Sequence, residues 1–187
     1  MESFKQEKKD EEEEKFKPKF IHLLDEEEVE VKRLGEEDIE ECVKVMRKCA
    51  FDVTEAEVKS IVDYEKSFGA TVNRMLIGVG LSWPARLDAE KMIIMHGDPN
   101  ALYLEDPAVL LAYEGRGIRR ILLKEREKEA TESEFKYVIS YLYEDLPKGN
   151  ISEYIREAGS QLEKLFLSED YEFHRTEKGT LAFKKIA

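Results

Sequence analysis

The chain has 187 residues, of which 42% are hydrophobic and 39% charged, and its 42 acidic and 30 basic side chains give a formal net charge of −12. This length is typical of one domain, and the acidic excess argues against a nucleic-acid binder, because such proteins need a basic surface to displace counterions from phosphates. The longest nearly uncharged run, 75–84, is shorter than the roughly 20 residues of a membrane span, so we expect no membrane insertion.

The first 28 residues hold 11 acidic and 6 basic side chains, which predicts a charged, flexible N-terminal tail over 1–28. Its apolar second half could dock on the body of the protein or on a second copy of the chain, as in a homodimer. No apolar stretch there resembles a signal peptide, so we expect a cytoplasmic protein. The abundance of Glu and Lys, with few Gln and Asn, is typical of thermophile proteins.

The remainder, 29–187, is expected to form a single domain that begins with a strand and two helices. Apolar and charged residues alternate over 29–34, which predicts a short strand. Helical spacing then predicts a helix over 39–50. A capping box begins a second helix at Thr54, and we expect this helix to continue to a C-cap at Gly69.

The pattern changes to β between residues 71 and 111, where turn signals separate three apolar strands that form an antiparallel meander. We expect these strands at 75–83, 92–95 and 102–111. The later elements alternate between helical and β patterns: a helix over 118–130, a strand over 137–143, a helix over 151–167, and a hairpin of 171–176 with 179–186. Interleaved helices and strands predict the α/β (α+β) class, with a mixed central sheet covered by helices.

One segment differs from the rest, because a strand runs through a turn with Gly115 and Gly117 directly into an amphipathic helix. Backbone N–H groups at such a helix start have no helical partner and lie at the positive end of the helix dipole. Glycine lets a phosphate approach the backbone closely, and Arg116, Arg119 and Arg120 add positive charge. The segment therefore predicts an anion site; a tight connection with solvated arginines is the alternative.

This segment resembles the acyl-CoA-binding motif of the GNAT superfamily of N-acetyltransferases. The family pattern is Arg or Gln, two residues, Gly, one residue, then Gly or Ala, and these three positions are Glu114, Gly117 and Arg119 here. Tyr113 to Ile118 match the core of the motif, whereas Glu114 and Arg119 depart from the usual residues. The order of elements from residue 29 onward also agrees with that family.

The resemblance implies a mixed, mostly antiparallel sheet of six to seven strands with helices on both faces, splayed between the fourth and fifth strands. It also implies acetyl-CoA or another acyl-CoA as cosubstrate. Val109 and Leu111 would then bind the pantetheine arm through their backbone. The pyrophosphate contacts would come from the segment that contains Glu114, Gly115, Arg116, Gly117, Ile118, Arg119 and Arg120.

The resemblance also suggests catalytic residues for acyl transfer to a primary amine. Tyr103-Leu104-Glu105-Asp106 is similar to the polyamine-acetylating branch of the family, in which the strand Glu faces the substrate amine. Glu105 is therefore the predicted base, although an edge-of-strand charge in solvent is the alternative. Strand alternation allows only one of Glu105 and Asp106 to face the cleft.

The proton donor for the leaving thiolate is a Tyr near the end of the fourth helix in many family members. Phe166 occupies that position here, and a Phe cannot donate a proton. Tyr171 is our candidate replacement, with Tyr154 and Ser168 as further options, and a core or surface role is the simpler interpretation of all three. The two cysteines and three histidines do not lie at metal-ligand spacing, so no metal is expected.

The leading hypothesis is thus an acetyl-CoA-dependent N-acetyltransferase. Its acidic surface suits a cationic acceptor through electrostatic steering. The alternatives are a non-catalytic acyl-CoA sensor or protein-interaction module of the same fold, and a phosphate-ligand binder of unrelated fold.

Overall fold

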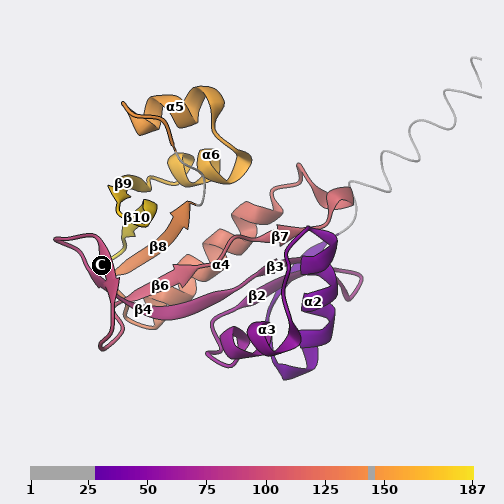
Figure 1. Cartoon of the computed structure of the whole chain (residues 1–187). Coiled ribbons are helices and arrows are strands. Elements are labelled where there is room, and N and C mark those ends of the chain that lie inside the picture. Colours follow the sequence, from indigo (N-terminus) through magenta and orange to yellow (C-terminus); the bar gives the residue numbers. More distant parts are fainter. Residues whose placement is uncertain (1–27, 143–145) are drawn as a thin grey trace, which may run out of the picture.

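The computed structural model describes residues 28–142 and 146–187 (Figure 1). The predicted tail, except for its last residue, and its docking lie outside this part of the chain. The helices are η1 (Glu36–Asp38), α2 (Ile39–Lys48), α3 (Glu55–Val62), η2 (Leu111–Tyr113), α4 (Ile118–Glu132), α5 (Ile151–Ala158) and α6 (Gln161–Ser168). The strands are β1 (Val29–Arg33), β2 (Phe68–Val72), β3 (Met75–Gly80), β4 (Ser82–Asp88), β5 (Ile93–Met95), β6 (Ala101–Leu104), β7 (Ala108–Val109), β8 (Tyr137–Leu142), β9 (Glu172–Thr176) and β10 (Gly179–Lys185).

The strands form two sheets, in the orders β1-β2-β3-β7 and β5-β4-β6-β8-β10-β9. Among the described strands, the pairing of β6 with β8 is parallel and the other pairings are antiparallel. The β6–β8 ladder covers only 101–103, and beyond it β8 turns away from β7 (Figure 1). The mixed, mostly antiparallel sheet and its splay between the expected fourth and fifth strands are therefore confirmed.

Two expected strands are each broken in the middle, and the breaks lie opposite each other. The predicted strand 75–83 divides into β3 and β4 around Leu81, and the predicted strand 102–111 divides into β6 and β7 around 105–107, where Pro107 lacks the N–H group of a regular ladder. The Glu105 N–H donates to the Leu81 carbonyl at 3.0 Å across this level. The expected single sheet is therefore two sheets joined at these breaks.

A buried cation binds the carbonyl groups at both breaks. Arg126 of α4 is 1% exposed, and its Nη1 donates to the carbonyl oxygens of Leu81 at 3.1 Å and Glu105 at 3.0 Å. Gly80 faces the same side chain, and a Cβ there would lie 3.0 Å from Arg126 Nε. Arg126 thus compensates polar backbone groups that would otherwise be costly to bury.

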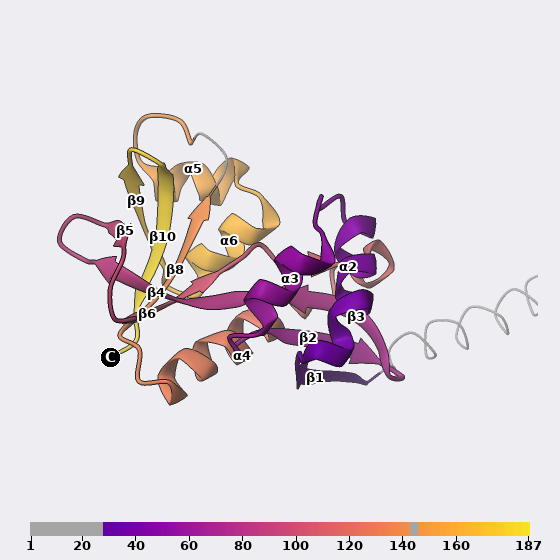
Figure 2. The same cartoon turned by 60° about the horizontal axis from the view of Figure 1, so that its bottom comes forward.

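Helices cover both faces of the sheet that contains β2 and β3, as expected. One hydrophobic cluster joins α2 and α3 to Leu76 and Val79, and another joins Ile77 to Ile118 and Leu122 of α4. Figure 2 shows α2 and α3 on one side and α4 on the other. In the described part of the chain, no helix combines the length and apolar character that a membrane crossing needs.

The second predicted helix is shorter than expected. α3 begins at the predicted capping box, with Glu57 N–H donating to Thr54 Oγ1 at 3.2 Å, but it ends at Val62. Gly69 lies in the fully buried strand β2, where a Cβ would be 2.6 Å from Leu76 Cδ1. The prediction of a C-cap there was wrong, because this glycine permits close packing rather than a helix end.

The predicted helix 151–167 is divided into α5 and α6. Gly159 is extended (φ −67°, ψ 157°), and Ser160 begins a new capping box with Glu163. The Ser160 N–H donates to Glu163 Oε1 at 2.7 Å, and the Glu163 N–H donates to Ser160 Oγ at 3.2 Å. The capping box at Ser160 therefore begins a separate helix, although the continuous apolar face had predicted a single helix over 151–167.

Candidate functional site

The glycine turn leads into α4 as predicted. Gly115 and Gly117 have φ values of +75° and +76°, a region that disfavours residues with a Cβ. The first backbone bond of the helix runs from the Ile121 N–H to the Gly117 carbonyl at 3.1 Å. The N–H groups of 117–120 therefore have no partner within the helix and can donate hydrogen bonds to an anion.

A close approach of helix and sheet fixes the start of α4. Gly78 of β3 faces the helix, and a Cβ there would lie 2.9 Å from Ile118 Cγ2. Ile118 is 2% exposed and packs in one cluster with Val109 and Leu122. The turn is therefore held against β3 and β7 by apolar contacts.

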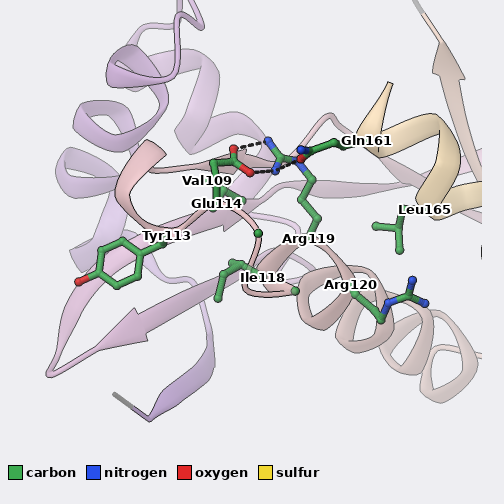
Figure 3. Close-up of a pocket in the computed structure, with 10 residues that line it drawn as sticks. Val109, Tyr113, Glu114, Ile118, Arg119, Arg120, Gln161 and Leu165 are labelled. Carbon is green, nitrogen blue, oxygen red and sulfur yellow. Dashed lines mark hydrogen bonds and ion pairs between the residues drawn. The ribbon is translucent and has the colours of Figure 1, made fainter. Parts of the chain in front are cut away.

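Two cavities meet beside this turn. The smaller one, of about 150 Å3, is bounded by the turn, the first residues of α4 and the α6 side chains Gln161 and Leu165 (Figure 3). The larger one, of about 660 Å3, extends past Asp106 and Pro107 to Cys49 near the end of α2. Together they form a cleft that begins at the turn and follows the open side of β7.

An ion pair between Glu114 and Arg119 lies in this cleft. The Arg119 Nη2 donates to Glu114 Oε1 at 2.8 Å, and Nη1 donates to the other carboxylate oxygen, so the pair is bidentate (Figure 3). Arg119 Nη1 also lies 3.5 Å from Gln161 Oε1 on α6. The two residues that depart from the expected motif are therefore paired with each other.

The other two arginines of the segment have their own interactions. Arg120 donates to Ser168 Oγ at 3.1 Å and pairs with Glu169. The guanidinium of Arg116 lies 4.9 Å from the centre of the Tyr113 ring. Arg119 and Arg120 line the smaller cavity, whereas Arg116 does not line either cavity of this cleft.

Val109 presents a strand edge to the cleft. Its neighbour Leu110 donates its N–H to Ile77 of β3 at 2.9 Å, so the backbone groups of Val109 point the opposite way. The Val109 carbonyl accepts a hydrogen bond from Cys49 Sγ at 3.2 Å, and Val109 lines both cavities. Leu111, predicted beside it on the strand, lies in η2 with 88% of its surface exposed and lines the larger cavity.

The two adjacent carboxylates have different surroundings. Asp106 lines the larger cavity, and burial raises the pKa of its carboxyl above the ordinary value of 3.8, with a further contribution from Glu105. Glu105 is not among the residues that line this cavity; its Oε1 accepts from Trp83 Nε1 at 2.9 Å. The structure therefore brings Asp106, and not the predicted Glu105, to this part of the cleft.

Tyr171, the candidate proton donor, lies apart from the cleft. It is 3% exposed, and its hydroxyl donates to Glu127 Oε1 at 2.9 Å. Phe166 packs against it, with ring centroids 4.7 Å apart, and is 1% exposed. Burial and the neighbouring Glu127 raise the pKa of Tyr171. This placement favours the core role that was the alternative for Tyr171.

Cys49 and Gln161 are cleft residues that the sequence did not identify. The spacing of the cysteines addresses only a role as metal ligands, and the apolar pattern places Gln161 inside an expected continuous helix. Both reach the cleft through tertiary packing, since α2 ends beside β7 and Gln161 is the first residue of α6. Burial, followed by the charge of Glu114, raises the pKa of the Cys49 thiol. Among the described residues, no group of three or more His, Cys, Asp or Glu side chains is placed to hold a metal ion.

Comparison with solved structures identifies the fold. No family sequence model and no curated protein sequence matches the chain. Among solved structures, the loading GNATL domain of CurA from Lyngbya majuscula superposes with a TM-score of 0.65 at 13% identity, over 84% of this chain and 98% of that chain. The chain has the fold of the GNAT superfamily.

Two acetyltransferases of this GNAT fold give similar results. The ribosomal-protein-S18-alanine N-acetyltransferase from Escherichia coli matches with a TM-score of 0.58 and 14% identity, covering 83% of this chain and 91% of its own. PaiA N-acetyltransferase from Thermoplasma acidophilum, whose structure contains coenzyme A, matches with a TM-score of 0.55 and 17% identity, covering 85% and 99%. At these identities the similarity shows the GNAT fold alone.

Proposed function

We propose that the chain is an acyl-CoA-dependent N-acyltransferase that moves an acetyl group to a primary amine. The observation that carries the proposal is the glycine turn at the start of α4, which opens into the cleft lined by Val109 of β7 and by Gln161 and Leu165 of α6. The GNAT fold and the presence of coenzyme A in a solved relative support it. We infer that CoA binds as a cosubstrate and that the reaction needs no metal.

The residues of the cleft fit the parts of such a ligand. The N–H groups of 117–120 suit a pyrophosphate, and the outward backbone groups of Val109 suit the amide groups of pantetheine. Leu111 remains a proposed contact from the edge of the larger cavity. The cleft between Asp106 and Cys49 would hold the thioester and the amine.

Asp106 is our preferred base, because it lines the larger cavity with a raised pKa. It would take a proton from the ammonium group, and the neutral nitrogen would then attack the thioester carbonyl. The acyl group joins the nitrogen and the C–S bond breaks; the nitrogen then loses its second proton, which neutralises the thiolate so that it leaves as a thiol. Glu105 remains the second candidate, with its carboxylate held by Trp83.

A thermal-shift titration with acetyl-CoA, CoA and ATP tests the cosubstrate, since a ligand that binds only the folded state raises its stability. We expect stabilisation by both CoA species and none by ATP. Release of free thiol from acetyl-CoA, measured across primary amines, then tests transfer. Absence of CoA binding at millimolar ligand would refute the proposal.

A non-catalytic acyl-CoA sensor is the second candidate. It is favoured by Phe166 at the position of the family tyrosine and by the burial of Tyr171, which leave the thiolate without the usual donor. CoA binding without thiol release in the presence of any amine would support the sensor over the enzyme.

A further inference from the structure

The two cavities of the cleft meet at a small set of shared residues. Val109, Glu114, Arg119 and Gln161 line both of them. The Glu114–Arg119 ion pair therefore lies between the turn and the larger cavity, with the amide of Gln161 beside it (Figure 3). A ligand that extends from the turn to Asp106 has to pass this pair.

The pair is accessible enough to open. Its two side chains are 25% and 26% exposed, so solvent reduces the free energy that holds them together. Among the described residues, Glu114 and, at a longer distance, Gln161 bind the Arg119 guanidinium. A bidentate arginine can exchange one oxyanion for another without changing its hydrogen-bond geometry.

The Glu114 carboxylate is also an anion beside an anion site. A phosphate at the start of α4 would be repelled by Glu114 and attracted by Arg119, whereas Arg120 is already bound to Glu169 and Ser168. Carboxylate and phosphate therefore compete for one guanidinium. A ligand without phosphates supplies no phosphate oxygen that could replace the Glu114 carboxylate at Arg119.

We propose that the Glu114–Arg119 pair is a phosphate gate, which makes entry to the cleft depend on the pyrophosphate of the ligand. Arg119 leaves Glu114 and binds a phosphate oxygen, and the thioester arm then passes between the two cavities. The gate rests on the proposed function, since it assumes CoA as the ligand. It selects acyl-CoA against thioester carriers that lack phosphates, such as acyl-pantetheine.

The test compares Glu114→Gln, Arg119→Gln and the control Glu90→Gln, which makes the same charge change as Glu114→Gln at an exposed turn. CoA affinity is measured by calorimetry, and pantetheine binding by ligand-observed NMR. We expect Glu114→Gln to tighten CoA binding about threefold to tenfold, because the competing carboxylate is gone. We expect Arg119→Gln to weaken CoA binding about tenfold, because Glu114 is left unpaired beside the phosphates.

For Arg119→Gln, the expected change in pantetheine affinity is opposite to the expected change in CoA affinity. Both variants break the pair without removing a contact that pantetheine needs, so each should bind it more tightly than the parent protein does, and Glu90→Gln should change neither ligand. Equal CoA affinity in the parent and Glu114→Gln, or weaker pantetheine binding in Arg119→Gln, would overturn the gate while leaving the proposed function intact. Absence of CoA binding in both the parent and Glu114→Gln would refute the proposed function itself.

Discussion

Asp106 and Glu105 follow each other in the chain, yet only Asp106 lines the larger cavity. The chain is irregular at 105–107, so strict alternation of a strand does not apply to these side chains. Trp83 holds Glu105, whereas Asp106 has its pKa raised, first by burial and then by Glu105, against the lowering effect of Arg126. Asp106 is therefore the carboxylate suited to act as a base in the cleft, whereas Glu105 is hydrogen-bonded to Trp83.

Replacing Asp106 tests its role as the base. We expect Asp106→Asn to lower kcat/KM by about 10² to 10⁴ while CoA affinity stays within about twofold. Because a base acts when deprotonated, activity of the parent protein should fall as pH drops through a pKa above 3.8. This acidic limb should disappear in Asp106→Asn and remain in Glu105→Gln. Loss of activity in Glu105→Gln alone would assign the base to Glu105.

The charge of Arg126 acts on the same carboxylate. We expect Arg126→Met to lower the free energy of unfolding by about 2–4 kcal/mol, because the Glu105 carbonyl loses the Arg126 donor and the Leu81 carbonyl, which keeps the Glu105 N–H, loses its second donor. The positive charge of Arg126 lowers the pKa of Asp106, so its removal should shift the acidic limb to higher pH.

Lys128→Met, on the exposed face of the same helix, is the matched control in urea unfolding and pH-rate measurements. It should leave both quantities unchanged. An unshifted acidic limb in Arg126→Met would show that Arg126 has no influence on the reacting carboxylate.

At the scale of elements, Glu129 joins α4 to the first half of the chain. Its carboxylate accepts from Arg33 of β1 at 2.6 Å, from Lys66 at 3.0 Å and from Ser133 at 3.0 Å. Burial alone would raise the pKa of Glu129, but these hydrogen bonds together lower it below the ordinary value of 4.5. A lowered pKa in the folded state means that the ionised form stabilises the fold.

We therefore expect Glu129→Gln to destabilise the protein at pH 7, by a margin that shrinks as pH falls below about 4.5 and the parent carboxylate becomes protonated. Urea unfolding across this pH range measures the difference. Glu132→Gln, exposed on the same helix, should show a much smaller effect. A difference that does not depend on pH would exclude this carboxylate as its source.

The sequence predicted best those helices that have both a recognisable N-terminal signal and a regular spacing of apolar residues. The capping box at Thr54 and the glycine turn before Ile118 mark real helix starts. The predictions were wrong at two places. Gly69 is not a C-cap, because Leu76 packs against it in the sheet. The expected helix 151–167 is divided, because a second capping box at Ser160 interrupts its continuous apolar face. The local sequence does not show which side chain packs against Gly69. It also does not show whether a capping box or a continuous apolar face determines where a helix ends.

The candidate site was predictable in its backbone part and less so in its side chains. Gly115 and Gly117 are needed for positive φ, which a sequence motif records directly. The Glu114–Arg119 pair and the position of Asp106 depend on how a turn and a strand break orient side chains. Cys49 reaches Val109 from 60 residues away, and no local pattern encodes such a contact.

At the scale of the whole molecule, the formal net charge of −12 should attract a cationic amine over a long range. Salt shortens this range, to about 10 Å at 0.1 M. We expect KM for a cationic amine to rise with ionic strength while kcat stays constant. An arylamine, neutral at the same pH, should show no such rise, and equal salt dependence for both would exclude steering by the protein.

The opposed breaks at Leu81 and 105–107 also determine where the molecule can flex. Each long strand changes sheet at this level, and the parallel β6–β8 ladder, which continues only over 101–103, lies on one side of it. Bending should therefore concentrate at the two breaks, with the sheet of β1, β2, β3 and β7 moving as one rigid body and the sheet of β5, β4, β6, β8, β10 and β9 as the other. Separation of the two sheets would admit a ligand at a low energetic cost, because no ladder joins β7 to β8 in the described part of the chain.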